Sequence, residues 1–118
     1  MQTYNRYKSL FIAAYLDCAK WSSGEEFDNA QLSEEARQVL TGNAALFFDN
    51  NKDLIEEFVW ASDSHYAQAG HSCWLSSNGH GAGYFDFSDN VAAQELQTLS
   101  EQSKGFNLYI GDDGLVYV

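Results

Sequence analysis

Residues 71–87 read HSCWLSSNGHGAGYFDF, and the interpretation of this stretch decides the fold class of the chain. Aromatic residues and short polar alternation surround a glycine-rich centre, which is typical of a β-hairpin. Asn78 and Gly79 form the pair that two-residue hairpin turns prefer, since such turns need positive φ angles. The later glycines would permit a bulge packed against large rings. The stretch therefore predicts two strands and a turn.

A second hairpin is predicted at the end of the chain, where residues 106–118 read FNLYIGDDGLVYV. Leu108 and Ile110 alternate with polar or aromatic neighbours, an Asp-Gly pair supplies the turn, and residues 116–118 return. The exposed edge of this hairpin could pair with another copy of the chain, which would make the protein a self-assembling module or a homodimer.

Helices are predicted before, between and beside these hairpins. An apolar face repeats at helical spacing over roughly residues 3–21. Ser33 is the expected N-cap of a second helix. Residues 49–51 are expected to separate that helix from a short third one, and Ser88 or Asp89 to cap a fourth that ends before Gly105. The apolar positions used are Tyr7, Phe11, Ala14, Cys18 and Trp21, then Ala36, Leu40, Ala44 and Phe47, then Ala92, Leu96 and Leu99.

Together these elements predict a single α+β domain over residues 1–118. A small antiparallel sheet of about four strands, arranged as two hairpins, would pack against three to four helices. A chain of 118 residues is long enough to bury a core of this kind.

Charge is the strongest global feature, because 17 acidic residues oppose 6 Lys and Arg and give a net charge of -11. Such a chain repels phosphate, so direct binding to nucleic acid is disfavoured. Residues 53–103 contain no Lys or Arg at all. This acidic stretch should attract partners with a basic surface. The alternative is that the charge serves solubility alone.

The two cysteines, Cys18 and Cys73, occupy positions expected of small core residues. No segment has the length or hydropathy of a membrane span, and the N-terminal apolar run lacks the features of a signal peptide. We therefore expect a soluble cytoplasmic protein with reduced thiols and no membrane partner.

Three histidines, His65, His71 and His80, fall close together, and Cys73 or Asp86 could join them around a metal ion. None of these residues has the short spacing that makes a metal motif specific. The glycine run lacks the spacing and the lysine of a phosphate-binding loop, and Gly-Asp-Asp-Gly near the C-terminus lacks calcium-loop spacing. We expect no metal, cofactor or catalytic residue. A small enzyme or metal-binding protein that uses His71, His80 and Asp86 remains the alternative.

Residues 69–86, AGHSCWLSSNGHGAGYFD, resemble a motif of small uncharacterised proteins of bacteriophages and other mobile elements. Members of that family read approximately AGHDFWLTRNGHGAGFWD there. A closing segment similar to residues 108–117, LYIGDDGLVY, follows in them. This chain has Ser77 where the motif has arginine, its one strong anion-binding group. The resemblance implies a mobile-element source, and small acidic proteins from such elements often inhibit host defence, sometimes by imitating the charge of DNA.

The leading interpretation is a non-enzymatic binding protein. Its acidic face would occupy the basic surface of a host nucleic-acid-binding protein, such as a CRISPR or restriction component, in the cytoplasm of the host cell. The residues predicted to bind the partner are Asp53, Glu56, Glu57, Asp63, Tyr66, Tyr84, Asp86 and Asp89. Within the motif, the residues of interest are His71, Asn78, His80 and Asp86.

Overall fold

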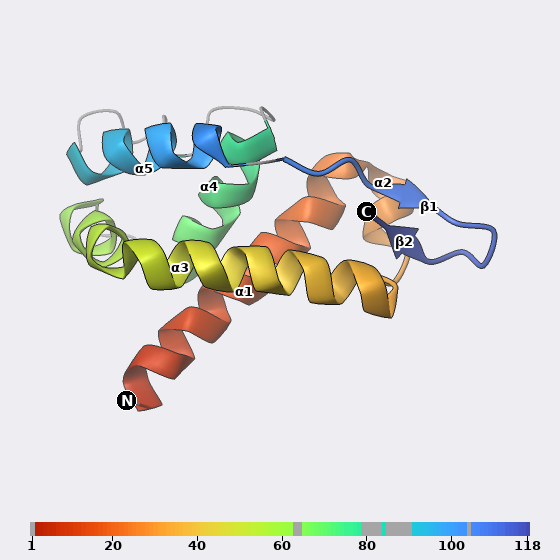
Figure 1. The fold of residues 1–118 in the computed structure, drawn as a ribbon, viewed down its shortest axis with the longest axis horizontal. Helices are drawn as coiled ribbons and strands as arrows, with labels where there is room; N and C mark the ends of the chain where they lie inside the picture. The colour runs from red at the N-terminus through yellow and green to blue at the C-terminus, as the bar shows by residue number, and fades with distance from the viewer. Residues whose placement is uncertain (1, 63–64, 79–83, 85–90, 104) are drawn as a thin grey trace.

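Two long helices, α1 (Gln2–Ser23) and α3 (Glu34–Ser62), run in opposite directions and form the frame of the fold (Figure 1). The short helix α2 (Glu25–Asp28) lies in the connection between them, and α4 (Tyr66–Asn78) and α5 (Val91–Gln102) complete the helical part. The strands β1 (Tyr109–Ile110) and β2 (Val116–Tyr117) lie at the end of the molecule where α1 ends and α3 begins. This computed structural model describes residues 2–62, 65–78, 84, 91–103 and 105–118.

The prediction of an α+β fold with about four strands is wrong. Residues 66–78 form helix α4, so the first half of the expected hairpin is helical. In the described ranges, the chain is mostly helical and has a single two-stranded antiparallel sheet. Residues 79–83 and 85–90, which would complete that hairpin, lie outside the described residues.

Helix α4 forms because its small residues let it approach α1 very closely. A Cβ atom at Gly70 would lie 2.0 Å from the backbone oxygen of Phe11, so only glycine fits at this crossing. One helical turn later, the ring of Trp74 packs edge-on against Tyr15 at 5.4 Å between centroids. The indole nitrogen of Trp74 donates a hydrogen bond of 2.7 Å to Ser22 at the end of α1. Close helix packing therefore overrides the strand-like composition of this segment.

Helix α1 forms where the sequence predicted it, but only Phe11 and Cys18 of the predicted apolar face are buried, and Tyr7 is 36% exposed. The buried side of α1 is completed by Tyr15 and Ala19. Trp21, placed on that face by the sequence pattern, is instead 61% exposed. Two side-chain contacts fix α1 against α3: Tyr15 accepts a hydrogen bond from Asn43, and Lys8 forms an ion pair with Asp49 at 2.8 Å.

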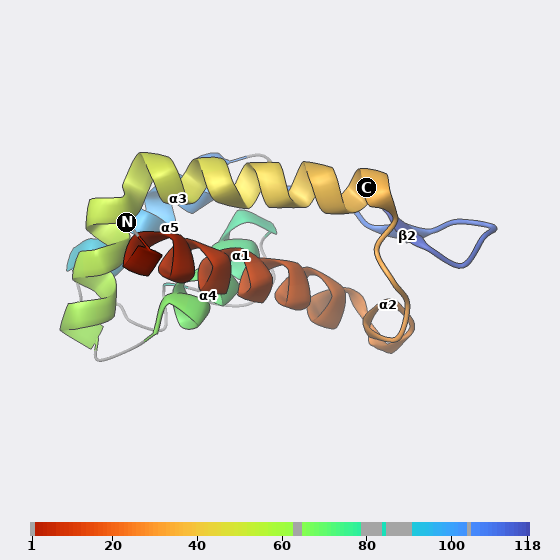
Figure 2. The same cartoon turned by 90° about the horizontal axis from the view of Figure 1, so that it is seen from below.

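Helix α3 joins the predicted second and third helices into one element that changes direction at the expected break. Asn51 leaves the helical region, with φ −129° and ψ 23°, and its side chain donates to the backbone oxygen of Phe47 at 3.0 Å. Figure 2 shows the part of α3 after this point turning away from its first part. The predicted N-cap is confirmed, because the Ser33 hydroxyl accepts the backbone N–H of Ala36 at 3.0 Å.

The closing hairpin is confirmed, with Tyr109 opposite Tyr117 and Ile110 opposite Val116. Gly114 has a φ of 82°, which explains why its turn contains glycine. On its other side, β2 forms a parallel bridge between Val116 and Leu32. Two backbone hydrogen bonds of 2.9 Å, one from Ser33 to Val116 and one from Val116 to Gln31, hold this bridge. The C-terminal strand is thereby tied to the start of α3.

Asn78 connects the end of α4 to the chain that follows α5. Its side-chain nitrogen donates to the backbone oxygen of Trp74 at 2.9 Å, and its side-chain oxygen accepts the N–H of Phe106 at 2.7 Å. Gly105 faces the same group, since an added Cβ would lie 2.7 Å from Asn78 Oδ1. Gly105 does not have the positive φ expected of a helix-ending glycine. The close approach of the chain to the end of α4 explains why residue 105 is a glycine.

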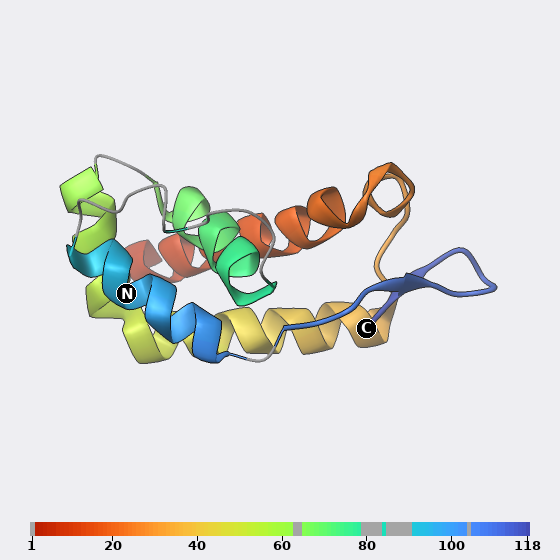
Figure 3. The ribbon, with the colours of Figure 1, turned by 90° about the horizontal axis from the view of Figure 1, so that it is seen from above.

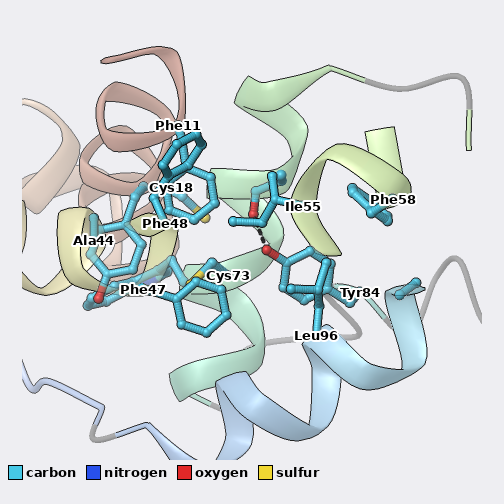
Figure 4. Packing of buried hydrophobic residues seen from close by; sticks show 14 of the residues in the cluster. Phe11, Cys18, Ala44, Phe47, Phe48, Ile55, Phe58, Cys73, Tyr84 and Leu96 are labelled. Carbon is cyan, nitrogen blue, oxygen red and sulfur yellow. Dashed lines mark hydrogen bonds between the residues drawn. The ribbon is translucent and has the colours of Figure 1, made fainter. Parts of the chain in front are cut away.

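The core lies where α1, α3, α4 and α5 meet. Figure 3 shows α5 alongside α3, and Figure 4 shows aromatic side chains of the core, among them Phe11, Phe48 and Tyr84. Ala92 and Leu96 of α5 are buried, as their spacing predicted. The core ring of Tyr84 packs edge-on against Phe58 at 5.2 Å between centroids, and its hydroxyl donates a hydrogen bond of 2.6 Å to the backbone oxygen of Ala69 (Figure 4). None of the described helices is long and apolar enough to cross a membrane.

Candidate functional site

The part of α3 that follows Asn51 presents a carboxylate-rich outer face. Ile55 and Phe58 on its inner side are fully buried against the core. Residues three, four and seven positions apart share a helix face, so burial of the inner side directs Asp53, Glu56 and Glu57 outward. All three carboxylates are exposed. The three carboxylates therefore share the outward side of this half-helix.

Trp60 lies on the same outward face and is 79% exposed, the largest exposed fraction among the large apolar side chains in the described ranges. An indole left in water is a side chain suited to an interface, where tryptophan contributes strongly to binding energy. The sequence pattern did not select Trp60. Trp60 lies seven residues after Asp53 and three and four residues after the two glutamates. This helical spacing was the feature of the sequence that could have placed it on the same face. We call Asp53, Glu56, Glu57 and Trp60 the α3 acidic face.

Tyr66, at the start of α4, extends this surface toward α1. Its ring stacks on Tyr7 with 4.2 Å between centroids and 6° between planes. Partial burial raises the pKa of the Tyr66 hydroxyl, and the nearby charges of Glu56 and Tyr7 raise it further. Glu56 of the α3 acidic face is thus close enough to Tyr66 to raise its pKa. Tyr66 remains a neutral aromatic group next to carboxylates, as an interface anchor requires.

Of the other residues predicted to bind a partner, Tyr84 has no exposed surface at all. Besides the bond from its hydroxyl, its backbone N–H donates to the Ser76 hydroxyl at 3.1 Å, and Ser76 in turn donates to Gln97 at 2.7 Å. This network ties Tyr84 to both α4 and α5. We therefore assign Tyr84 to the core and leave it out of the binding surface. Asp63, Asp86 and Asp89 lie outside the described residues.

The motif residues separate into different environments. His71 lies on α4, where its ring is 5.7 Å from that of the exposed Trp21. Asn78 has both ends of its amide engaged in the structural contacts given above. His80 and Asp86 lie outside the described residues, so convergence of His71, His80 and Asp86 stays untested.

The possible metal ligands and the two cysteines were the remaining candidates for chemistry in the described part of the chain. No group of three or more His, Cys, Asp or Glu side chains there could hold a metal ion. Cys18 and Cys73 are free and buried. Burial raises the pKa of each thiol to about 12, so neither supplies a thiolate at neutral pH.

The edges of the closing hairpin differ in their availability for self-assembly. Strand β2 is flanked by β1 on one side and by the bridge to Leu32 on the other. Pairing with another copy would therefore have to use β1, which has two residues. An edge this short offers few hydrogen bonds to a second copy.

No protein-family model matches the chain, and no curated protein or solved structure matches it either. The similarity of residues 69–86 and 108–117 to a mobile-element family therefore stays a prediction.

Proposed function

We propose that this protein is a non-enzymatic binding protein that uses the α3 acidic face to cover a basic surface on another protein. The observation that carries the proposal is the position of Trp60, 79% exposed, on the same helix face as Asp53, Glu56 and Glu57. Carboxylates guide a basic partner and speed its association, while an aromatic side chain supplies the contact area that holds it.

The rest of the chain supports the same class of partner. The net charge of -11 adds a long-range attraction for basic surfaces. Residues 53–103 contain no Lys or Arg, and the exposed Lys52 lies directly before this stretch. Strongly basic surfaces are typical of proteins that bind nucleic acid. We therefore propose a nucleic-acid-binding protein as the partner. Inhibition of a host defence protein by a mobile-element product is the specific form of the proposal that the sequence resemblance favours.

The proposal predicts that charge reversal on the α3 acidic face removes partner binding. The test variant is Asp53→Lys, Glu56→Lys and Glu57→Lys in one chain. Its matched control reverses three exposed carboxylates elsewhere, Glu26, Glu95 and Asp112, so that both variants have the same net charge. Each protein would be immobilised and exposed to nuclease-treated lysate, and the captured proteins would be identified by mass spectrometry.

We expect the native chain and the control to capture the same basic protein, which duplex DNA should displace. The α3 variant should lose it. Binding measured with the purified partner should weaken by roughly two orders of magnitude, because three close charge pairs contribute about 1 kcal/mol each. If the two variants lose the partner equally, overall charge rather than the α3 acidic face governs binding, and the proposal fails.

Trp60→Ala tests the aromatic part separately. Removing an exposed side chain should leave the free energy of unfolding within about 0.5 kcal/mol of the native value. Affinity for the partner should nevertheless fall by tenfold or more, in the range of about 2 kcal/mol that interface tryptophans contribute. Unchanged affinity would remove Trp60 from the binding surface.

A further inference from the structure

A pocket of about 360 Å³ lies between the second half of α1 and residues 31–37, at the opposite end of α3 from the α3 acidic face. Leu16 and Leu32 contribute apolar surface to its lining. Asp17, Lys20 and Arg37 contribute charges of both signs. The pocket is thus small, partly apolar and zwitterionic in character, unlike the rest of this acidic protein.

The two cations occupy the same level of the antiparallel helix pair. Lys8 on α1 contacts Asp49 on α3, and Tyr15 contacts Asn43, so each step along α1 corresponds to a step back along α3. Continuing that register brings Lys20 opposite the region of Arg37. Both side chains line the pocket from different helices. They can therefore approach one anionic group from two sides.

Neither cation is held in an ion pair by a residue of the described ranges. In the described part of the chain, the side chains of Lys20 and Arg37 have no ion-pair or hydrogen-bond partner. Asp17 also forms no ion pair, although it lies three residues from Lys20 on the same helix and such residues are neighbours. This is unusual in a chain with only 6 Lys and Arg against 17 Asp and Glu. Each charge remains available to a ligand.

The side of the pocket formed by Gln31 and Leu32 is held in place by backbone contacts. Val116 donates to Gln31 and accepts from Ser33, both at 2.9 Å, and it bridges Leu32. Leu32 also packs against the core. The apolar surface offered to a ligand is therefore preorganised, which lowers the entropic cost of binding.

We propose that this pocket binds a small aliphatic α-amino acid. The carboxylate lies between Lys20 and Arg37, and the guanidinium can hold it through two parallel hydrogen bonds. The ammonium group meets Asp17, and the aliphatic side chain covers Leu16 and Leu32. A ligand that carries an ammonium and a carboxylate group on the same carbon atom matches this pocket better than a simple anion does. Asp17 and the acidic surroundings would oppose an anion that lacks the ammonium group.

The test is a titration of the full chain followed by two-dimensional ¹H–¹⁵N NMR, with three ligands of nearly equal size. L-Leucine has both charges, leucinamide lacks the carboxylate, and 4-methylpentanoate lacks the ammonium group. We expect L-leucine to shift the resonances of pocket residues such as Leu16 and Leu32, with an affinity at least about tenfold above that of either analogue. Equal affinity for L-leucine and either analogue would overturn the proposal, as would shifts scattered over the whole surface.

Variants test the assignment of each charge. Arg37→Ala and Lys20→Gln should each weaken L-leucine binding by about tenfold, while Asp17→Asn should remove the preference over 4-methylpentanoate. The matched control is Arg6→Ala, which removes an exposed cation of α1 outside the pocket and should leave the affinity unchanged. Two independent cation variants keep the test decisive if one of them folds poorly. Retained affinity in a folded Arg37→Ala or Lys20→Gln variant would overturn the proposed site.

Discussion

Replacing Gly70 with alanine should destabilise the protein, although alanine is the better helix former. The added Cβ would lie 2.0 Å from the backbone oxygen of Phe11 and 2.9 Å from its carbonyl carbon, whereas real Cβ atoms essentially never approach closer than 3.0 Å. Helices α1 and α4 would have to separate by about 1 Å, and neither contact atom belongs to a side chain that could move aside. Such overpacking costs about 3 kcal/mol, and the gain in helix propensity offsets about 1 kcal/mol. We expect a net loss of about 2 kcal/mol.

Gly42→Ala is the matched control, because Gly42 also lies within a helix but an added Cβ there would meet nothing within 4 Å. That variant should be more stable than the native chain by about 0.5 to 1 kcal/mol. Urea unfolding followed by circular dichroism would measure both changes. If Gly70→Ala is as stable as the native chain, the close crossing of α1 and α4 is incorrect. If both variants lose stability equally, the effect belongs to helical glycines in general.

Two further predictions concern groups in and near the core. Asn78→Ala should lower the free energy of unfolding by about 2 kcal/mol in the same urea experiment, because it removes the hydrogen bonds to Trp74 and Phe106. An unchanged free energy of unfolding would contradict the role given to this side chain. The thiols of Cys18 and Cys73 have their pKa raised from 9.0 to about 12 in the folded chain, so the unfolded chain loses these protons first. Stability should therefore be retained below pH 9.0 and fall between there and about pH 12. Urea titrations at several pH values would show this, and Cys73→Ala should reduce the slope; a slope unchanged by that substitution would contradict the assignment.

Much of the helical frame could be predicted from the sequence because its signals are local. Burial of Phe11 and Cys18 follows from helical spacing, and the Ser33 cap follows from the residue types at a helix start. The turn before Gly114 likewise depends on one residue that tolerates a positive φ. Each of these features is determined within a few residues, so neighbouring sequence is sufficient to specify it.

Helix α4 could not be recognised in this way because its stability depends on a distant segment. Gly70 and Ser72 are both buried, yet glycine and serine weaken the apolar periodicity by which a helix is recognised. Glycine favours this helix only because the backbone of Phe11 lies against it. Asn78 followed by glycine suggested a hairpin turn, but the same asparagine side chain bonds back to its own helix. The carboxylates of the candidate site were accessible to sequence reasoning, whereas the orientation of Trp60 required knowledge of which helix face is buried.

The bridge between Val116 and Leu32 has a consequence for the order of folding. Backbone groups just before α3 are hydrogen-bonded to Val116 of the C-terminal strand. This junction therefore closes a long loop that contains α3, α4 and α5. Helices α1 and α3 can meet earlier through contacts that need only the first half of the sequence. Closing the long loop is slow relative to local helix formation. The junction at residues 31–33 should therefore be the last part of the frame to become native and the first to open when the C-terminal strand detaches.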